Sequence, residues 1–370
     1  MLTLKVVQAK FGDCLILIFG QKEKPKYMLI DGGPGGIYRD HLRTELTKIK
    51  DSGGKLDLVV LSHVDGDHIV GLLDLTEELK ENAADGAEPV IEIKELWMNS
   101  FAQSISKGNN LKIALQNMLT NVYNLSSTFP SGNLALLSII QGDTLRRNAL
   151  LLNIPQNLTS QGEIISYDAV PEPVSMENVK LKIIGPNKEN LDKLRKEWHE
   201  WIRKNESKIM TTDRELLNQI DRSVPNLSSI MFLLEADGKK MLFTGDGRGD
   251  FILEGLQNAG LLDEKGSIHI EIFKVPHHGS IRNTTKDFFK KVTADQYIIS
   301  GDGRHDNPGF ETLSWIVAAA HEEKRKILLV CTNRTGATEK LEKEFPVDKY
   351  GYQVQYLSKE DHSLDLILIP

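Results

Sequence analysis

Residues 56–68 read LDLVVLSHVDGDH and join an apolar run directly to a dense group of ionisable side chains. The run LDLVVLS is typical of a buried strand, because it is almost continuously apolar over the length of a strand. A regular strand or helix could not turn the side chains that follow toward one point, whereas a tight loop containing Gly66 allows it. The loop HVDGDH supplies four side chains of types that bind metals: His63, Asp65, Asp67 and His68.

The same arrangement, an apolar strand followed by an acid or a histidine, recurs along the chain. Segments of this kind are LIDGG (29–33), LFTGD (242–246), KVPHHGS (274–280), IISGDGRHDNP (298–308) and, more weakly, VPNLSS (224–229). Residues 38–50 carry the apolar spacing of a helix between two such strands. This rhythm predicts an α/β or α+β sheet with its chemistry at the strand ends.

A D-x-D-G fragment by itself is also typical of a calcium-binding loop or of a plain turn. HVDGDH lacks the remaining positions of an EF-hand loop. Asp246 and the His277-His278 pair also follow buried strands, and they favour a metal site over a turn. Ionisable groups clustered beside buried strands repel and desolvate one another unless a cation neutralises them. The sequence therefore predicts a metal centre.

The composition is that of a globular protein with ample apolar material for a core: 370 residues, 40% hydrophobic and 26% charged. Every apolar run is shorter than the roughly 18 residues of a membrane span, and the N-terminus does not resemble a signal peptide. Because the only cysteines are Cys14 and Cys331, we exclude a disulfide framework and a cysteine-rich zinc site, and expect a cytoplasmic location without membrane contact. The net charge of −7 argues against broad adhesion to polyanions.

The length of the chain suggests either one large fold with an insertion or two domains. Strand signals dominate up to residue 75 and again from residue 226, and the polar, helix-like stretches between them lie at about 101–125, 132–152 and 188–221. We therefore expect residues 1–370 to form a single domain with a largely helical insertion at about 76–225. The helix at 188–221 is expected to pack on the core, with binding of a protein partner as the alternative.

The order of the ionisable residues resembles that of the metallo-β-lactamase superfamily, in which the signature H-x-H-x-D-H precedes a bridging Asp and a last His. The resemblance is closer to the metallo-β-lactamase-like domain of the ComEC competence proteins. That group also has an Asp where Asp65 stands, a Gly-Asp pair like Gly12-Asp13 near the N-terminus, and segments similar to LFTGD and KVPHHGS. The resemblance covers residues 1–75 and roughly 180–340.

The resemblance implies a fold of the α+β class, an αββα metallo-β-lactamase sandwich with a helical insertion. It also implies two divalent metal ions, zinc or manganese, at one edge of the sandwich. Asp31 is expected to lie outside the ligands and to orient them. The ligands that the resemblance implies are His63 and Asp65 for the first ion, Asp67 and His68 for the second, Asp246 between them, and one of the pair 277–278 for the second ion, with His277 favoured over His278.

The chain departs from the family pattern at two places. Relatives supply a histidine ahead of the segment that matches LFTGD, but Asn226 or a serine stands there in this chain, so we expect the first metal site to be short of a ligand. The final His-Pro of the relatives is replaced by Asn307-Pro308, with His305 two residues earlier. His305 is a candidate proton donor or phosphate contact, with an ordinary loop histidine as the alternative.

The resemblance implies hydrolysis by a water that two metal ions activate, and we take Asp67 and His305 as the candidate catalytic residues. Asp65 makes the site richer in oxygen ligands, which shifts its preference toward Mn²⁺, although Zn²⁺ binds more tightly in general. An anionic diester can lend further oxygens to such a site, so we expect a phosphodiesterase or nuclease acting on nucleotides or nucleic acids. Arg248 and Ser280 are candidate phosphate contacts, although a surface charge and a turn are the simpler interpretations.

Two other functions stay open at this point. The same fold could hydrolyse a different ester, such as a lactone, a thioester or a phosphocholine ester. Alternatively, the chain is a degenerate, non-catalytic module whose insertion binds a protein partner. The sequence does not indicate the oligomeric state.

Overall fold

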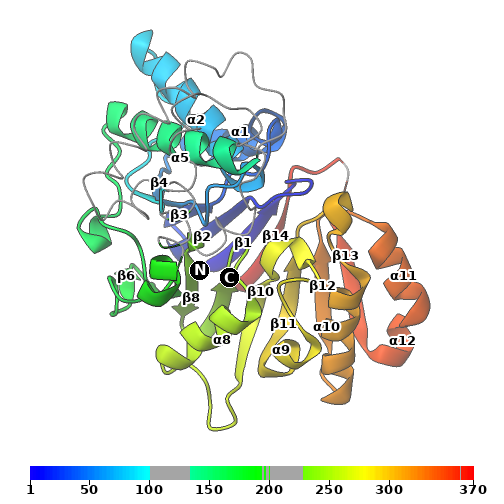
Figure 1. Ribbon diagram of the computed structural model, residues 1–370. Helices are drawn as coiled ribbons and strands as arrows, with labels where there is room; N and C mark the ends of the chain where they lie inside the picture. The colour runs from blue at the N-terminus through cyan, green and yellow to red at the C-terminus, as the bar shows by residue number, and fades with distance from the viewer. Residues whose placement is uncertain (101–133, 194–195, 197–199, 201–227, 359) are drawn as a thin grey trace.

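In the computed structural model, two β-sheets stack face to face and helices cover both outer surfaces (Figure 1). The structure describes residues 1–100, 134–193, 196, 200, 228–358 and 360–370. The first sheet carries α1 (Arg43–Asp51), α2 (Gly66–Ala84) and α5 (Leu134–Leu151). The second carries α8 (Gly249–Asn258), α9 (Lys286–Lys291), α10 (Phe310–Glu322), α11 (Gly336–Glu344) and α12 (Val347–Tyr350). This arrangement confirms the predicted αββα sandwich of the α+β class.

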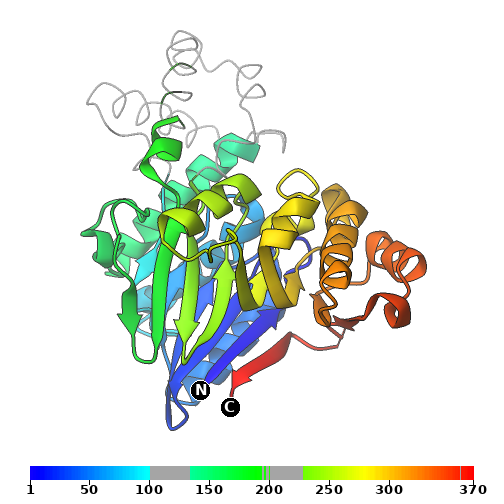
Figure 2. The same cartoon turned by 90° about the horizontal axis from the view of Figure 1, so that it is seen from below.

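Among the described residues, the first sheet has six strands in the order β14 (Ser363–Ile369), β1 (Leu2–Val7), β2 (Leu15–Gln21), β3 (Lys24–Ile30), β4 (Leu56–Val60) and β5 (Leu96–Trp97). The second has eight in the order β13 (Tyr352–Tyr356), β12 (Ile327–Cys331), β11 (Val292–Ile299), β10 (Ile268–Lys274), β9 (Lys239–Phe243), β8 (Met231–Ala236), β7 (Val179–Gly185) and β6 (Val174–Met176). Because β14 pairs antiparallel with β1, the two ends of the chain lie side by side (Figure 2).

Each strand that carries part of the predicted site runs parallel to at least one neighbour. In the first sheet β3 pairs in parallel with β4, and in the second sheet β10 pairs in parallel with both β9 and β11. The carboxyl ends of parallel strands meet at one edge of a sheet, so the loops that follow them collect there. The loops from the two stacked sheets meet at the same edge, since His63 after β4 lies against Asp246 after β9.

Alternation of side chains along the strands produces three layers of core. Leu2 and Leu4 of β1 pack between the sheets with Phe232 of β8, whereas Val59 of β4 packs beneath α2 with Leu72. A third layer lies between the second sheet and the helices α8, α9 and α10. One face of β4 is covered by the opposite sheet and the other by helices, which explains why its sequence is apolar without interruption.

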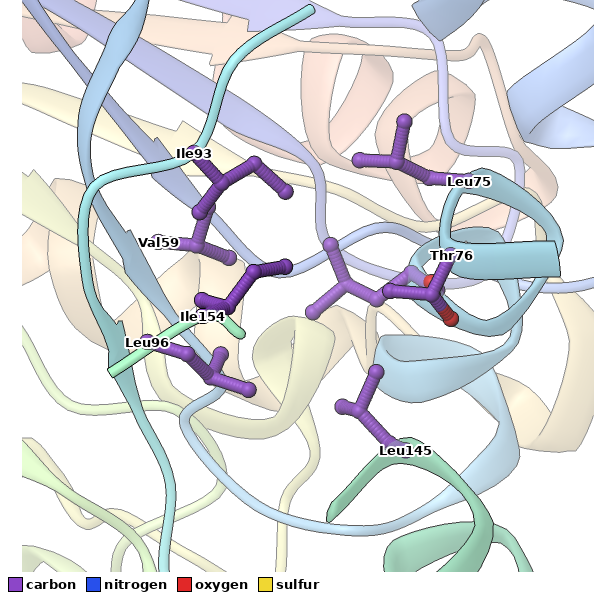
Figure 3. Close-up of a pocket in the computed structure, with 8 residues that line it drawn as sticks. Val59, Leu75, Thr76, Ile93, Leu96, Leu145 and Ile154 are labelled. Atoms are coloured by element: carbon purple, nitrogen blue, oxygen red, sulfur yellow. The ribbon is translucent and has the colours of Figure 1, made fainter. Parts of the chain in front are cut away.

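Helix α5 packs against α2 on the outer side of the first sheet (Figure 1). Leu145 of α5 lies across a small apolar pocket from Leu75 and Thr76 of α2 (Figure 3). Val59 of β4 and Ile154, which follows α5, line the same pocket. This apolar contact fixes α5 against the elements that lead into and out of the loop HVDGDH.

Most of the expected elements are present, and one strand is shorter than predicted. Residues 38–50 form a π-helical turn, Tyr38–Leu42, that continues into α1, and the stretch 132–152 corresponds to α5. The strand predicted at VIEIKELWMN is reduced to β5 and a single bridge between Leu56 and Ile93. Its outer side meets an irregular segment rather than a strand, since the Leu96 backbone bonds the Pro155 carbonyl and the Asn157 amide, so no continuous ladder forms.

The range 76–225 contains sheet as well as helix, because β5, β6 and β7 extend the two sheets from within it. The helix predicted at 101–125 and most of the one at 188–221 lie outside the described residues. The single-domain assignment with an insertion stays a prediction. In the part of the chain that the structure describes, no helix combines the length and the apolar character that crossing a membrane requires.

Candidate metal centre

Ligand-type side chains from four strand ends meet at the edge of the sandwich. The loop HVDGDH follows β4 and runs into α2, and Asp31 follows β3. From the second sheet, Asp246 follows β9 and the pair His277-His278 follows β10. The side chains that face one another there divide into two groups that share Asp246.

The first group surrounds one oxygen of Asp246. The His63 Nε2 atom lies 3.6 Å from Asp246 Oδ2 and 3.7 Å from Asp65 Oδ2. The His277 Nε2 atom lies 3.4 Å from the same Asp246 Oδ2. Two imidazole nitrogens therefore lie near Asp246 Oδ2, and the Asp65 carboxylate lies near one of them.

The second group surrounds the other oxygen of Asp246. The His68 Nε2 atom lies 3.3 Å from Asp246 Oδ1 and 3.9 Å from Asp67 Oδ2. The His278 Nε2 atom lies 3.1 Å from Asp67 Oδ2 and 3.8 Å from Asp246 Oδ1. Asp246 thus presents one oxygen to each group, as a carboxylate that bridges two ions would.

The spacing and the burial of these atoms fit metal ions. Bonds of 2.0–2.1 Å in a tetrahedral site separate the ligand atoms by roughly 3.4 Å, and the distances above scatter around this value. Among the described residues, the Nε2 atoms of His63 and His68 and the Oδ1 atom of Asp246 are buried without a hydrogen-bond partner. A buried polar atom without a hydrogen-bond partner costs about 1–3 kcal/mol of folding free energy. Metal ions bound in the two groups would give each of these three atoms a partner.

Hydrogen bonds behind the first-sheet histidines hold their rings in place. The Nδ1 atom of His68 lies 2.8 Å from Asp31 Oδ2. Asp31 also accepts hydrogen bonds from the backbone N–H and the hydroxyl of Ser62, each 2.7 Å long, and the same hydroxyl lies 3.1 Å from Nδ1 of His63. Asp31 therefore contacts the His68 ring at Nδ1, whereas Nε2 of the same ring faces Asp246, and its role in orienting the ligands stays a prediction.

The histidines of the second sheet have partners of the same kind. The Nδ1 atom of His277 lies 2.9 Å from Asn283 Oδ1, and the Nδ1 atom of His278 lies 3.2 Å from Asp13 Oδ1. Asp13 in turn forms a 2.7 Å ion pair with the buried Lys274. All four histidines thus have Nδ1 held from outside and Nε2 turned toward the acids, the arrangement found around metal-binding imidazoles.

The charges of these groups depend on one another. Burial works to lower the pKa of His278, but Asp13 and Asp67 outweigh it and raise the pKa to about 9. Burial works to raise the pKa of Asp67, but His68 and His278 lower it to about 2. For Asp65, burial and the neighbouring acids raise the pKa together. Without a cation, the raised pKa values of His63, His68 and His278 favour their protonated forms beside the carboxylates, and these protons would leave on metal binding.

Local backbone geometry separates the two adjacent histidines. His277 and His278 have φ angles of 49° and 54°, in the left-handed region that L-residues with a side chain seldom adopt. Consecutive residues in this region store strain that the surrounding structure must hold. The turn sends His277 toward Asp246 Oδ2 and His278 toward Asp67.

This division differs from the expected arrangement of the pair. The sequence favoured His277 as the completing residue of the second group, but His278 is the one that lies beside Asp67 and His68. His277 lies in the first group, which was expected to be short of a ligand. Asn226, which was expected near this position, lies outside the described residues.

The candidate phosphate contacts have ordinary structural partners. The Arg248 guanidinium forms a 2.6 Å ion pair with Asp250 and stacks over Phe251. Ser280 is buried, and its hydroxyl accepts a 3.4 Å hydrogen bond from the backbone N–H of Arg282, as in a turn. These contacts match the simpler interpretations of both residues.

The loop that replaces the relatives' final His-Pro flanks the site. The backbone carbonyl of Gly279, directly after the histidine pair, accepts a 3.0 Å hydrogen bond from Gly309. Asn307 is half-buried beside this contact, whereas His305 is exposed. Within the described part of the chain, His305 forms no hydrogen bond or ion pair with either group, and its catalytic role stays a prediction.

Several supporting residues were not predicted as part of the site. Asp13 and Lys274 lie in the segments that carried the ComEC resemblance, but nothing in the sequence links them to each other or to His278. Asn283 and Ser138 belong to no motif. The glycine at position 12, by contrast, has a steric explanation. A Cβ atom there would lie 2.0 Å from the Asp67 carbonyl oxygen, so only glycine lets Asp13 approach the loop HVDGDH.

Comparison with known proteins supports the superfamily for part of the chain. Residues 16–156 match the family model described as Metallo-beta-lactamase superfamily, which confirms the predicted resemblance there. The closer resemblance to ComEC stays a prediction. No curated protein matches the chain.

Two solved structures are similar to the chain at low identity. One is a new diphosphatase from the PhnP family, 11% identical, with a TM-score of 0.39 and coverage of 100% of this chain and 98% of that chain. The other is a beta-lactamase domain protein from Burkholderia ambifaria, 11% identical, with a TM-score of 0.30 and coverage of 69% and 61%. At these scores neither structure bears on the activity of this chain.

Proposed function

We propose that the protein is a metal-dependent hydrolase whose substrates are phosphodiesters, in nucleotides or nucleic acids. The observation that carries the proposal is the pair of donor groups on the two oxygens of Asp246. Two divalent cations bound there would lower the pKa of a water molecule and polarise the bond to be cleaved. The residues that would hold them are His63, Asp65 and His277 for the first, Asp67, His68 and His278 for the second, and Asp246 for both.

The open side of the centre is lined by the residues that we expect to meet the substrate. The side chains of Asp65, Asp67 and His277 are 27%, 25% and 31% exposed, whereas those of His63 and His68 are fully buried. We therefore expect a substrate to approach the centre from the side on which these three side chains are exposed. Asp67, whose pKa is lowered to about 2, is ionised at neutral pH and can accept a hydrogen bond from an attacking water and orient it.

The charge of the loaded centre favours an anionic substrate with hard oxygen atoms. Asp65, Asp67 and Asp246 against two divalent cations leave about +1 at the centre. Of the carboxylates behind the ligands, Asp13 is balanced by Lys274, whereas Asp31, 2.8 Å from His68 Nδ1, adds one negative charge outside the ligands. A phosphodiester shares one negative charge between two non-bridging oxygens and has an in-line leaving oxygen, and a two-metal site can stabilise all of them. The ComEC resemblance supports the same substrate class by analogy only.

The test is hydrolysis by metal-stripped protein reloaded with Mn²⁺ or Zn²⁺. We expect turnover of bis-nitrophenyl phosphate, and its loss in Asp67→Ala. Asp295→Ala is the matched control, because it removes an exposed carboxylate that pairs with His269, outside the two donor groups. Activity that survives in Asp67→Ala would contradict the proposal.

Parallel assays address the two alternative functions. A lactone, a thioester and a phosphocholine ester are offered to the same preparations, and preferential turnover of one of them would replace the phosphodiester with that ester. Sub-stoichiometric metal in the purified protein, with no rescue by added Mn²⁺, would indicate a non-catalytic module.

A further inference from the structure

One helix from the range 76–225 touches the candidate metal centre directly. Ser138, on α5, is buried, and its hydroxyl donates a 3.0 Å hydrogen bond to Asp65 Oδ1. The other oxygen, Asp65 Oδ2, is the one that lies 3.7 Å from His63 Nε2 in the first group. The hydroxyl thus holds one carboxylate oxygen and leaves the second one facing the donors.

Close packing further along α5, beyond Ser138, fixes this contact. A Cβ atom at Gly142, one turn further along α5, would lie 2.9 Å from the Val64 side chain, so the absence of a side chain brings the helix against the loop HVDGDH. Further along α5, the Asn148 amide donates a 3.1 Å hydrogen bond to the Thr76 hydroxyl of α2. Figure 1 shows α5 lying alongside α2, whose first turn contains the second half of that loop.

Asp65 requires such a partner for a physical reason. Each of the four imidazoles has its outer nitrogen held by another side chain, so its inner nitrogen can point in only one direction. A carboxylate has two equivalent oxygens and rotates about its terminal bond, so one of them must be held before the other has a defined position. Ser138 does this for Asp65.

We infer that Ser138 is a positioning residue for the first metal ion and that α5 is a structural part of the metal centre. The inference rests on the proposed metal centre but not on the identity of the substrate. It also assigns a role to part of the range 76–225, in which the sequence indicates no candidate functional residue. Partners in the outer layer of a metal site typically contribute 10–100-fold to metal affinity.

The test is a titration of metal-stripped protein with Co²⁺, followed by visible absorption and by calorimetry, without substrate. We expect two binding steps in the unmodified protein. Ser138→Ala should weaken one step by 10–100-fold and leave the other within about threefold. Asp31→Asn, which acts through His68, should weaken the other step.

Asn148→Ala is the control for a general loosening of α5, because Asn148 bonds α2 without touching Asp65. The inference is overturned if Ser138→Ala leaves both steps unchanged, weakens both alike, weakens the same step as Asp31→Asn, or is reproduced by Asn148→Ala. If the protein takes up no metal, the inference and the proposed function both fail. If two Co²⁺ ions bind as described but no phosphodiester is cleaved, only the proposed function fails.

Discussion

Lys274→Met should strongly destabilise the metal-free protein. Lys274 is 1% exposed and forms a 2.7 Å ion pair with Asp13, which is 2% exposed. The substitution retains much of the apolar stem and removes the ammonium group, so a carboxylate remains buried without its main counter-charge. Removing one partner of a buried pair costs about 3–5 kcal/mol of unfolding free energy.

The structure places the expected cost near the lower end, at about 3 kcal/mol. The reason is His278, whose Nδ1 lies 3.2 Å from Asp13 Oδ1 and whose pKa of about 9 keeps it cationic at pH 7 without metal. Asp13→Asn, which leaves the ammonium buried instead, should also destabilise. The double variant should cost less than the sum of the two single variants, because it leaves neither charge alone.

The pH dependence of the unfolding free energy tests the Asp13–Lys274 pair in a second, independent way. Burial raises the pKa of Asp13, but Lys274 and His278 lower it further, to well below its ordinary value. Its contribution to stability is therefore present above the unfolded pKa, near 3.9, and is lost as the pH falls below that value. Without Lys274 the pKa of Asp13 rises, so the cost of the variant should shrink as the pH falls from 7 toward 4.

Urea unfolding at pH 7 and pH 5, followed by far-UV circular dichroism, measures these free energies. A cost below about 1 kcal/mol at pH 7 is typical of an exposed ion pair and would refute the reasoning. A cost that does not change between the two pH values would show that the charge of Asp13 is not its source.

Two further predictions concern the histidine pair and the apolar contact of α5. His277→Ala should weaken the same Co²⁺-binding step as Ser138→Ala, and His278→Ala the same step as Asp31→Asn, because the two imidazoles lie in different groups. Titration of all four variants with Co²⁺ checks this. If His277→Ala and His278→Ala weakened the same step, the prediction would be contradicted. Leu145→Ala should lower the free energy of unfolding in urea by about 2–5 kcal/mol. Leu145 is 1% exposed and lines an existing pocket, so the substitution enlarges a cavity that the neighbouring side chains cannot fill. A loss under about 1 kcal/mol would mean that α5 does not depend on this contact.

Strand periodicity, which is local, was sufficient to predict most of the strands, whereas the two stacked sheets were expected from the family resemblance. The alternation in β1 and the continuous apolar run of β4 follow from which faces are covered, and the sequence pattern records this directly. The strand at VIEIKELWMN is shorter than predicted, because its length depends on a neighbouring segment rather than on its own pattern. Whether a segment forms a ladder depends on its neighbour, and β5 lies beside an irregular segment at residues 155–157.

The sequence by itself determined which residue types gather at the edge of the sandwich, because parallel strands deliver their following loops to one side. It could not decide which group receives His277 and which receives His278, since that depends on two left-handed backbone positions held by the packing of the loop. The contacts of Asp13 with His278 and of Ser138 with Asp65 join residues far apart in the chain. Only the stacking of the sheets and the docking of α5 bring them within hydrogen-bond distance, and no local pattern encodes such a distance.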